Sequence, residues 1–466
     1  MPRSSISAIR PAGVAAWPGV RRHTWRAVLL AAVFTAAYTL FALGRHAALR
    51  TNGFDLGIFE QAVRGYANGE LPVSTIRDPH LILFGDHFSP VIALIAPLYR
   101  LFPAAETLLV VQAVLFGVSI IPVTRAATRL LSPAAGLVIG VCYGLSWGLQ
   151  AALAFDFHEI AFAVPLLAFA LEAFLSGRYG RAVALAAPLV LVKEDLGLTV
   201  AVLGLLIATR TGHRKLGLVT AVGGLVAALL TVFVVIPQFS VDGGYRYLGT
   251  GGLLPTGETF RGELFDPRKL ELVALLCAPT LFLCLRSALV LLAVPTLAWR
   301  LVGTNLLYWV PGFHYDAILM PILFFALIDA AVRLRPAVGR WCRRLALPRL
   351  LPAAAVAVAL LGTAGVIAAH FPLRELLIPG FGAQTSEAAA ARRLMDRIPD
   401  GASVATENRL APHLTNRTLV YPIGAADRPE WTLAEVGRRA ELAVAIAMAD
   451  SVRQDGGFIL IRHHRR

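Results

Sequence analysis

NGFDLGIFEQAVRGYANGELPVSTIRDPHLILFGDHFSP, which spans Asn52 to Pro90, is a polar island between two long apolar segments. Only 15% of the 466 residues are charged, so the titratable side chains gathered here need an explanation. They are Asp55, Glu60, Asp78, Asp86 and His87. We interpret the island as the first external loop of a protein that crosses the membrane many times, and as part of its active site.

The composition supports a membrane location. Hydrophobic residues make up 57% of the chain and the mean hydropathy is +0.67, which exceeds the range of soluble globular domains. The net charge of +14 comes from basic residues in short clusters between apolar runs. Such clusters indicate lipid topology and do not favour nucleic acid as a partner. The expected partners are therefore membrane lipids.

The apolar runs predict an all-α polytopic membrane protein with about eleven transmembrane helices. Residues 1–26 are polar and basic, so the positive-inside rule makes them cytoplasmic and makes residues 45–89 the first external loop. Residues 27–370 form the transmembrane domain, including a span over 270–285. The apolar arms 182–192 and 196–209 are short for spans, and are either tilted re-entrant helices or one span with buried charges. We expect a plasma-membrane protein with its C-terminus outside.

The island itself has a local pattern. Leu56, Phe59, Val63 and Tyr66 recur at helical spacing, which predicts an amphipathic helix of about three turns lying along the membrane surface. Asp55 stands where the N-cap of this helix would be. Further along the helix, Glu60 and Arg64 have the spacing of an ion pair. His87 comes just before Phe88-Ser89-Pro90, a pattern typical of a helix start.

Residues 371–466 are less apolar and predict a small extracytoplasmic α/β domain. We expect a helix from Ser386 to about Arg397 and a long helix over 433–452. Strands are expected over 402–406, 418–423 and 458–461.

In this topology, polar groups from distant parts of the chain reach one side of the membrane. They are Asp55 with Glu60, Asp86 with His87, Asp156 with His158 and Glu159, Lys193 with Glu194 and Asp195, and His314 with Tyr315 and Asp316. Acids and histidines concentrated outside, opposite almost purely basic cytoplasmic turns, are what a proton-transfer site needs. The three consecutive charges at Lys193 are the most informative, because charges between apolar arms need a polar cavity.

Structural explanations exist for the same residues. Asp55 can cap a helix, the charges at Lys193 can form a local ion pair, and His314 and Tyr315 can belong to an interfacial aromatic belt with Tyr308 and Trp309. Asp156, His158 and Glu159 resemble metal ligands, but no second cluster at helical spacing accompanies them. The sequence identifies no metal site and no cofactor, and a divalent metal remains an alternative without support from ligand spacing.

With these residues in view, the chain resembles the bacterial and archaeal membrane family catalogued as domain of unknown function 2079. The blocks that carry the resemblance are FDLGIFEQ (Phe54–Gln61), HFSPVIALIAPLYRLFP (His87–Pro103), FDFHE (Phe155–Glu159), KEDLGL (Lys193–Leu198), FHYDAILMP (Phe313–Pro321) and IPDGASVATENRLAPHLTNR (Ile398–Arg417).

That family is in turn similar to the glycosyltransferase-C superfamily, whose members have many spans, an acid in the first large external loop and a polyprenyl-phosphate sugar donor. The resemblance implies that Asp55 is the general base and that Lys193 binds the donor phosphate. Many members have two adjacent acids in this loop, whereas here Leu56 follows Asp55. The other residues expected at the substrate site are His87, His158, Glu159, Glu194, Asp195, His314 and Tyr315.

The leading hypothesis is therefore a membrane glycosyltransferase that moves a sugar from a polyprenyl-phosphate donor to an acceptor on the outer face of the plasma membrane. A saccharide or lipid transporter, or flippase, would use the same charges along a translocation path. A non-catalytic membrane protein would leave the polar groups scattered in space.

Overall fold

A computed structural model describes residues 20–78, 81–248, 266–303, 305–348, 350–425 and 429–464. Its first part is helical, and the last hundred residues add a small sheet. The longer helices of the first part are α1 (Val20–Ala47), α2 (Ile58–Asn68), α4 (Ala105–Leu130), α5 (Pro133–Gly144), α7 (Ile160–Leu175), α9 (Leu196–Ala208), α10 (Arg214–Leu230), α13 (Pro267–Cys277), α15 (Leu319–Arg344) and α16 (Leu350–His370). The shorter ones are α3 (Ala96–Leu101), α6 (Trp147–Ala154), α8 (Tyr179–Ala186), α11 (Ile236–Phe239) and α14 (Val294–Val302).

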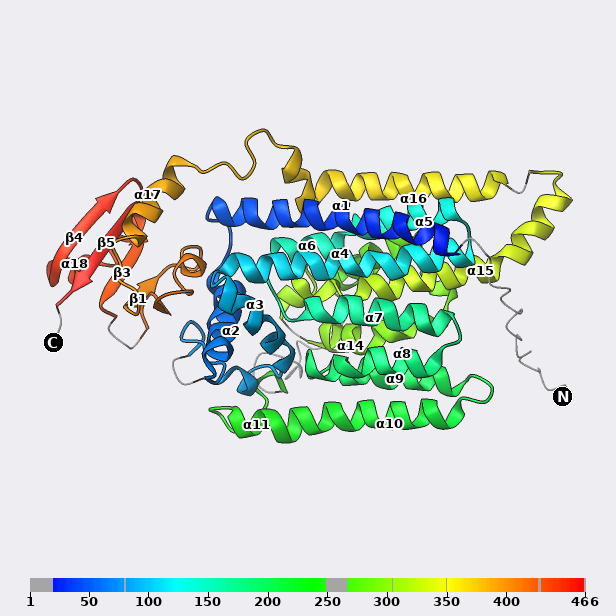
Figure 1. Ribbon diagram of the computed structural model, residues 1–466, viewed down its shortest axis with the longest axis horizontal. Helices are drawn as coiled ribbons and strands as arrows, with labels where there is room; N and C mark the ends of the chain where they lie inside the picture. Colours follow the sequence, from blue (N-terminus) through cyan, green and yellow to red (C-terminus); the bar gives the residue numbers. More distant parts are fainter. Residues whose placement is uncertain are drawn as a thin grey trace.

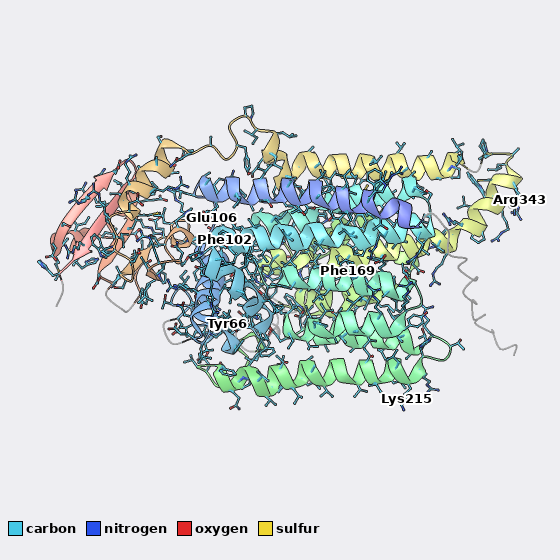
Figure 2. The ribbon with its side chains drawn as sticks, in the orientation of Figure 1. Tyr66, Phe102, Glu106, Phe169, Lys215 and Arg343 are labelled. Carbon is cyan, nitrogen blue, oxygen red and sulfur yellow. The ribbon has the colours of Figure 1, made fainter. Side chains whose placement is uncertain are left out.

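The long helices run side by side along the longest axis of the molecule, so the bundle has two distinct ends (Figure 1). We call the end that carries α2 and α3 the loop end. The opposite end, with the turns at 131–132, 176–178, 209–213 and 345–348, is the basic end. Figure 2 shows Lys215 and Arg343 at the basic end, and Tyr66, Phe102 and Glu106 at the loop end. The turns at the basic end carry basic residues, among them Arg178 and Arg210.

Six helical segments among the described residues are long and apolar enough to cross a membrane. They are Thr24–Ala47, Ala105–Leu130, Pro133–Ala154, Arg214–Phe239, His314–Arg344 and Leu350–His370. Five shorter apolar helical segments accompany them, including Tyr179–Leu191 and Leu196–Ala208. The chain is thus a multi-span helical membrane protein, with the two arms beside Lys193 present as separate short helices.

The segment 270–285, expected as a span, is not one continuous helix. Helix α13 ends at Cys277, and short 3₁₀ turns follow over Ala278–Thr280 and Leu283–Arg286. Pro279 has no N–H to continue the helical ladder, and Leu281 and Phe282 adopt left-handed φ angles of 53° and 60°. The helical ladder therefore breaks inside this segment, and the chain continues to Ser287, which donates to Asp329 of α15 (2.6 Å) before the segment that contains α14 begins.

Burial separates central helices from peripheral ones. In α4 and α15, 67% and 72% of the most apolar window is buried, against 33% in α10 and 17% in α16. The outer helices expose large apolar side chains, such as Val219 and Val222 of α10 and Val358 of α16. A contiguous apolar face of this kind on a soluble surface would be a liability, whereas lipid covers it in a membrane.

The tail is a small α/β unit, as expected. Its elements are α17 (Ser386–Met395), β1 (Ser403–Thr406), β2 (Leu419–Pro422), β3 (Trp431–Glu435), α18 (Ala443–Ala447), β4 (Ala449–Asp455) and β5 (Phe458–His463). The strand order is β2-β1-β3-β5-β4, with β1 parallel to β2 and β3, and β5 antiparallel to β3 and β4. The sheet lies beyond the loop end of the bundle (Figure 1).

The long helix expected over 433–452 is wrong, whereas the helix from Ser386 and the strands near 402, 418 and 458 are confirmed. Residues 431–435 form the central strand β3, and 449–455 form the edge strand β4. Strands β4 and β5 form a hairpin through Asp455-Gly456-Gly457, where Gly456 has a φ of 53°. Asp-Gly is a hairpin signal, and pairing across the sheet overrides the helical preference of this alanine-rich segment.

The tail packs directly on the first loop. Arg64 of α2 donates to the carbonyl oxygens of Thr415 (2.7 Å) and Thr418 (2.9 Å). Gln61 and Thr75 both donate to the carbonyl oxygen of Val420. Most of α2 is buried, including the polar side chains of Glu60 and Gln61, so the tail and the bundle cover the helix on both faces. The predicted amphipathic helix exists, but the tail covers its polar face.

Candidate functional site

Asp55 lies in the turn Gly53–Gly57, which leads into α2 at the loop end. The backbone before it is fixed from two directions. The amide of Asn52 donates to Oδ2 of Asp156 (2.8 Å), and the amide of Phe54 donates to Oδ1 of Asn408 in the tail (2.8 Å). A Cβ on Gly53 would come within 2.8 Å of the Ala411 side chain, so only glycine fits there without a shift.

The expected N-cap role of Asp55 is wrong. Helix α2 has Gly57 at its N-cap position and no side-chain cap. The amide of Ile58 instead donates to the carbonyl oxygens of Asp55 and Gly53, because the preceding turn runs straight into the helix. The Asp55 carboxylate is 24% exposed and is therefore available for contacts outside its own helix.

A chain of charged groups continues from Asp55 into the bundle. Oδ2 of Asp55 lies 3.6 Å from Nε2 of His158, and Nδ1 of the same histidine lies 2.6 Å from Oε2 of Glu159. The other oxygen of Glu159 accepts a hydrogen bond from Nζ of Lys193 at 2.9 Å. Glu159 is fully buried, and a buried carboxylate requires such partners. Burial raises the pKa of Asp55 above its ordinary value, although His158 opposes the shift.

His314 stacks on His158, with ring centroids 3.3 Å apart and an interplanar angle of 15°. His314 is only 5% exposed, and neither of its ring nitrogens has a hydrogen-bond partner among the residues that the structure describes. A buried polar group without a partner carries a desolvation cost of about 1–3 kcal/mol. One oxygen of Asp55 and one nitrogen of each histidine lie within 4.8 Å of one another.

Gln112 of α4 holds the turn that carries His158. Its side-chain amide donates to the carbonyl oxygen of Asp156 (2.7 Å), and its Oε1 accepts from the amide of His158 (3.1 Å). Gln112 is fully buried. It therefore fixes the position of the imidazole from a neighbouring helix.

A second group of polar side chains flanks this chain. Nδ1 of His87 lies 2.7 Å from Oε1 of Glu194, and the hydroxyl of Tyr245 donates to the same oxygen (2.8 Å). Burial and Lys193 disfavour a charged His87, but Glu194 outweighs them, so the pKa of His87 is raised. The His87 ring also stacks on Tyr247, with centroids 4.7 Å apart.

Aromatic side chains form the remaining wall. Trp299 donates from Nε1 to Oδ2 of Asp195 (3.0 Å), and its ring meets Tyr315 edge-on. A small cavity here is lined by Ile160, Lys193, Asp195, Trp299, His314 and Tyr315, among others. The turn that holds His314 and Tyr315 is anchored by Arg300, which donates to Asp316 and to the carbonyl oxygen of Tyr308.

The structure thus brings the sequence-predicted site residues together at the loop end. Asp55, His158, Glu159, Lys193 and His314 are in direct contact, and His87, Glu194, Asp195 and Tyr315 flank them. Glu60 lies apart from them. It accepts a hydrogen bond from the hydroxyl of Tyr99 (2.9 Å) and contacts the hydroxyl of Thr415. The predicted Glu60–Arg64 pair is wrong, since Arg64 donates to tail carbonyls instead.

Several contributors were not assigned from the sequence, namely Arg77, Gln112, Trp299, Arg300 and Asn408. Arg77 pairs with Asp86 (3.2 Å) beside His87. A lone arginine such as Arg300 inside an apolar run is a usable signal, because charges in such runs are costly unless they have a function or a partner. Gln112 and Asn408 act through contacts between distant segments, which no local pattern reveals.

The site is acidic. Among the described residues, its carboxylates are Asp55, Asp86, Glu159, Glu194, Asp195 and Asp316, and its lysine and arginine side chains are Arg77, Lys193 and Arg300. Lys193 and Arg300 are already paired with Glu159 and Asp316. Such a surplus of carboxylates attracts cations.

The fold matches solved structures over nearly the whole chain. Crystal structures of ArnT from Cupriavidus metallidurans, in the apo state and bound to undecaprenyl phosphate, align with a TM-score of 0.58 each. The alignments cover 94% of this chain and 98% of ArnT, at 16% and 17% sequence identity. At this identity the likeness shows that the two proteins share a fold.

No curated protein matches the chain in sequence. Residues 45–458 match the family described as predicted membrane protein (DUF2079). This match includes the first loop, the turns with His158, Lys193 and His314, and most of the tail. The resemblance drawn from the sequence blocks is confirmed, and the chain belongs to the DUF2079 family of predicted membrane proteins.

Proposed function

We propose that this protein transfers a sugar from a polyprenyl-phosphate donor to an acceptor hydroxyl at the loop end of its helix bundle. The observation that carries the proposal is the position of Asp55, a partly exposed carboxylate at the centre of polar side chains from several distant segments. The shared fold with ArnT, whose crystal structure holds undecaprenyl phosphate, supports a lipid-phosphate donor.

In this reaction the acceptor oxygen attacks the anomeric carbon, and the bond between that carbon and the phosphate oxygen breaks. The phosphate leaves with the bonding electron pair, and the hydroxyl proton passes to Asp55. Because the phosphate is a good leaving group, the protein has mainly to position the acceptor and accept its proton.

Lys193 is our candidate for contact with the donor phosphate. An ammonium group has three donors, and one of them holds Glu159 at 2.9 Å. The other N–H groups are suited to a phosphate oxygen in the cavity that Lys193 lines with Asp195 and Trp299. We propose that His87, Glu194, Asp195 and Tyr315 contact the sugar and the acceptor, and that His158 and Glu159 orient Asp55.

The test uses purified protein in detergent with a panel of undecaprenyl-phosphate-linked monosaccharides, and it measures undecaprenyl phosphate released in the presence of native membrane lipids as acceptors. Asp55→Asn should lower release by about 100-fold or more, which is the usual contribution of a general base. Asp242→Asn is the matched control, because Asp242 is an exposed acid with only a surface ion pair to Arg246. Unfolding temperatures check that both variants are folded.

Full release by Asp55→Asn would remove Asp55 from the mechanism. If the wild-type protein releases nothing from any donor, but moves a fluorescent lipid-linked sugar across a proteoliposome membrane, the transporter reading replaces the enzyme.

A further inference from the structure

We propose that Asp55, His158 and His314 bind one divalent transition-metal ion of the zinc type. The inference rests on the proposed function for its chemical role, but it stands on geometry of its own. One ligand atom from each residue lies within 4.8 Å of the other two, and the Asp55–His158 pair is already at 3.6 Å. Around a tetrahedral ion with bonds of about 2.0–2.1 Å, ligand atoms lie roughly 3.3 Å apart. Because a metal–imidazole bond lies in the plane of the ring, the two stacked rings must tilt away from parallel to point at one ion.

The second observation is the state of His314. The residue is 95% buried, yet within the described part of the chain both ring nitrogens lack a hydrogen-bond partner. Its ring lies parallel to that of His158 at 3.3 Å, and two charged imidazoles at this distance would repel each other. Neutral imidazole is the form that binds metals, and an ion would satisfy a nitrogen that is otherwise orphaned.

The surroundings of His158 support the same role. Metal-binding histidines usually direct their second ring nitrogen to a carboxylate, which fixes the tautomer and raises the basicity of the metal-binding nitrogen. Here Nδ1 of His158 lies 2.6 Å from Glu159, which leaves Nε2 facing Asp55. Lys193 in turn holds Glu159. Gln112 fixes the backbone of the turn, so the imidazole has supports on two sides.

The negative charge of the site is a further reason to expect a bound cation. Within the site, the described carboxylates outnumber the described lysine and arginine side chains. Of these, Lys193 and Arg300 already have carboxylate partners. A phosphate-bearing donor would meet a negative field there. A dication held by one carboxylate and two neutral imidazoles offsets that field and leaves coordination positions for a phosphate oxygen. The remaining oxygen of Asp55 then takes the acceptor proton.

The ligand set distinguishes between metals. Two imidazoles and one carboxylate suit zinc and other first-row transition metals, whereas magnesium and calcium prefer oxygen ligands. Binding of Mg²⁺ in preference to Zn²⁺ would therefore contradict the inference.

The test measures metal content directly on the full chain, purified with a tag that contains no histidine. After EDTA treatment and dialysis against Zn²⁺ alone, we expect about one ion per chain by elemental mass spectrometry. Cobalt in place of zinc should give visible absorption bands that report the coordination. His158→Ala and His314→Ala should each abolish stoichiometric binding. Glu159→Gln should weaken binding by roughly 10–100-fold, because it removes a supporting carboxylate rather than a ligand.

His370→Ala is the matched control, since His370 is exposed at the end of α16 and bonds only its own helix carbonyl at Val366. Should His314→Ala fail to fold, His314→Gln keeps the volume and removes the imidazole. Zinc binding that survives loss of either site histidine would overturn the inference. So would wild-type protein that binds no Zn²⁺.

The metal inference and the proposed function can be contradicted separately. Zinc bound at this site without any sugar release would support the metal inference and contradict the proposed function. Transfer at full rate in EDTA, by protein free of metal, would support the proposed function and contradict a metal in it.

Discussion

At the scale of single residues, one buried ion pair positions part of the site. Arg300 and Asp316 are both fully buried and bonded at 2.5 Å. Breaking such a pair typically costs about 3–5 kcal/mol, because it leaves one charge uncompensated. Asp316 follows His314 and Tyr315 in the same 3₁₀ turn. This pair therefore fixes two site side chains without itself needing to touch a substrate.

Glu60 gives a pH prediction, because burial raises its pKa from 4.5 to about 7. The folded protein therefore holds this proton between about pH 4.5 and 7 when the unfolded chain has lost it. Stability should fall as pH rises through this window, by about 3 kcal/mol at most. Glu60→Gln should flatten the dependence, and Glu70→Gln, an exposed acid of the same loop, should not. Unfolding temperatures of all three proteins at pH 5 and 7.5 measure the effect; parallel shifts would contradict it.

At the scale of elements, the tail and the first loop act as one unit. Asn408 accepts from the amides of Gly53 (2.6 Å, through its carbonyl) and Phe54 (2.8 Å, through its side chain). Its side-chain amide also reaches Oδ1 of Asn52 (3.2 Å). The residues on either side of this contact come from segments 354 positions apart in sequence. The tail is therefore a support for the turn that carries Asp55.

Asn408→Ala should loosen this turn. The amide of Phe54 loses its acceptor, and we expect transfer activity to fall by about tenfold or more, since small displacements of a catalytic group are costly. Hydrogen exchange at residues 53–57 should rise at the same time. Asn416→Ala is the control, because Asn416 lies in the same tail segment but contacts only the Pro103 carbonyl. Unchanged exchange in Asn408→Ala would show that the tail does not support the turn.

At the scale of the whole molecule, one end of the bundle carries basic side chains, among them Lys215 and Arg343 (Figure 2). Arg125 and Glu172 pair near the basic end, and Arg335 donates to the carbonyl oxygens of Leu130 and Leu131 there. From this basic end, the positive-inside rule predicts that the loop end and the tail lie outside the cytoplasm. The described cysteines are all buried, which makes introduced cysteines easy to detect.

Orientation can be measured with two single variants. Leu377 is 85% exposed in the turn Pro372–Leu377, whose Glu375 pairs with Arg50 next to the first loop. Lys215 lies at the basic end. In intact cells, a maleimide that does not cross membranes should label Leu377→Cys only. Permeabilised cells should label both, which controls for reactivity. Labelling of Lys215→Cys in intact cells would reverse the topology and place the site inside.

Sequence reasoning predicted the membrane class, the family and the grouping of the site residues. The grouping could be predicted because a charged side chain in an apolar segment requires a polar cavity or a partner. It failed where pairing between distant segments decides the local structure. Residues 433–452 have helical composition, but β3 lies between β1 and β5. Asp55 has the sequence pattern of a helix N-cap. In the structure, however, backbone carbonyl oxygens of the preceding turn accept the hydrogen bond from the first amide of α2. The stacking of His158 on His314 likewise depends on how separate helices pack.

The hydrogen bond from the Phe54 amide to the Asn408 side chain has a consequence for biosynthesis. A ribosome makes the Asp55 turn early and the residues that secure it almost last, so the site stays incomplete while the intervening helices insert. A chain released before Asn408 would carry every helix of the bundle and still hold its carboxylate loosely. The turn that carries Asp55 is thus secured only when the polypeptide is complete and its tail has reached the loop end of the bundle.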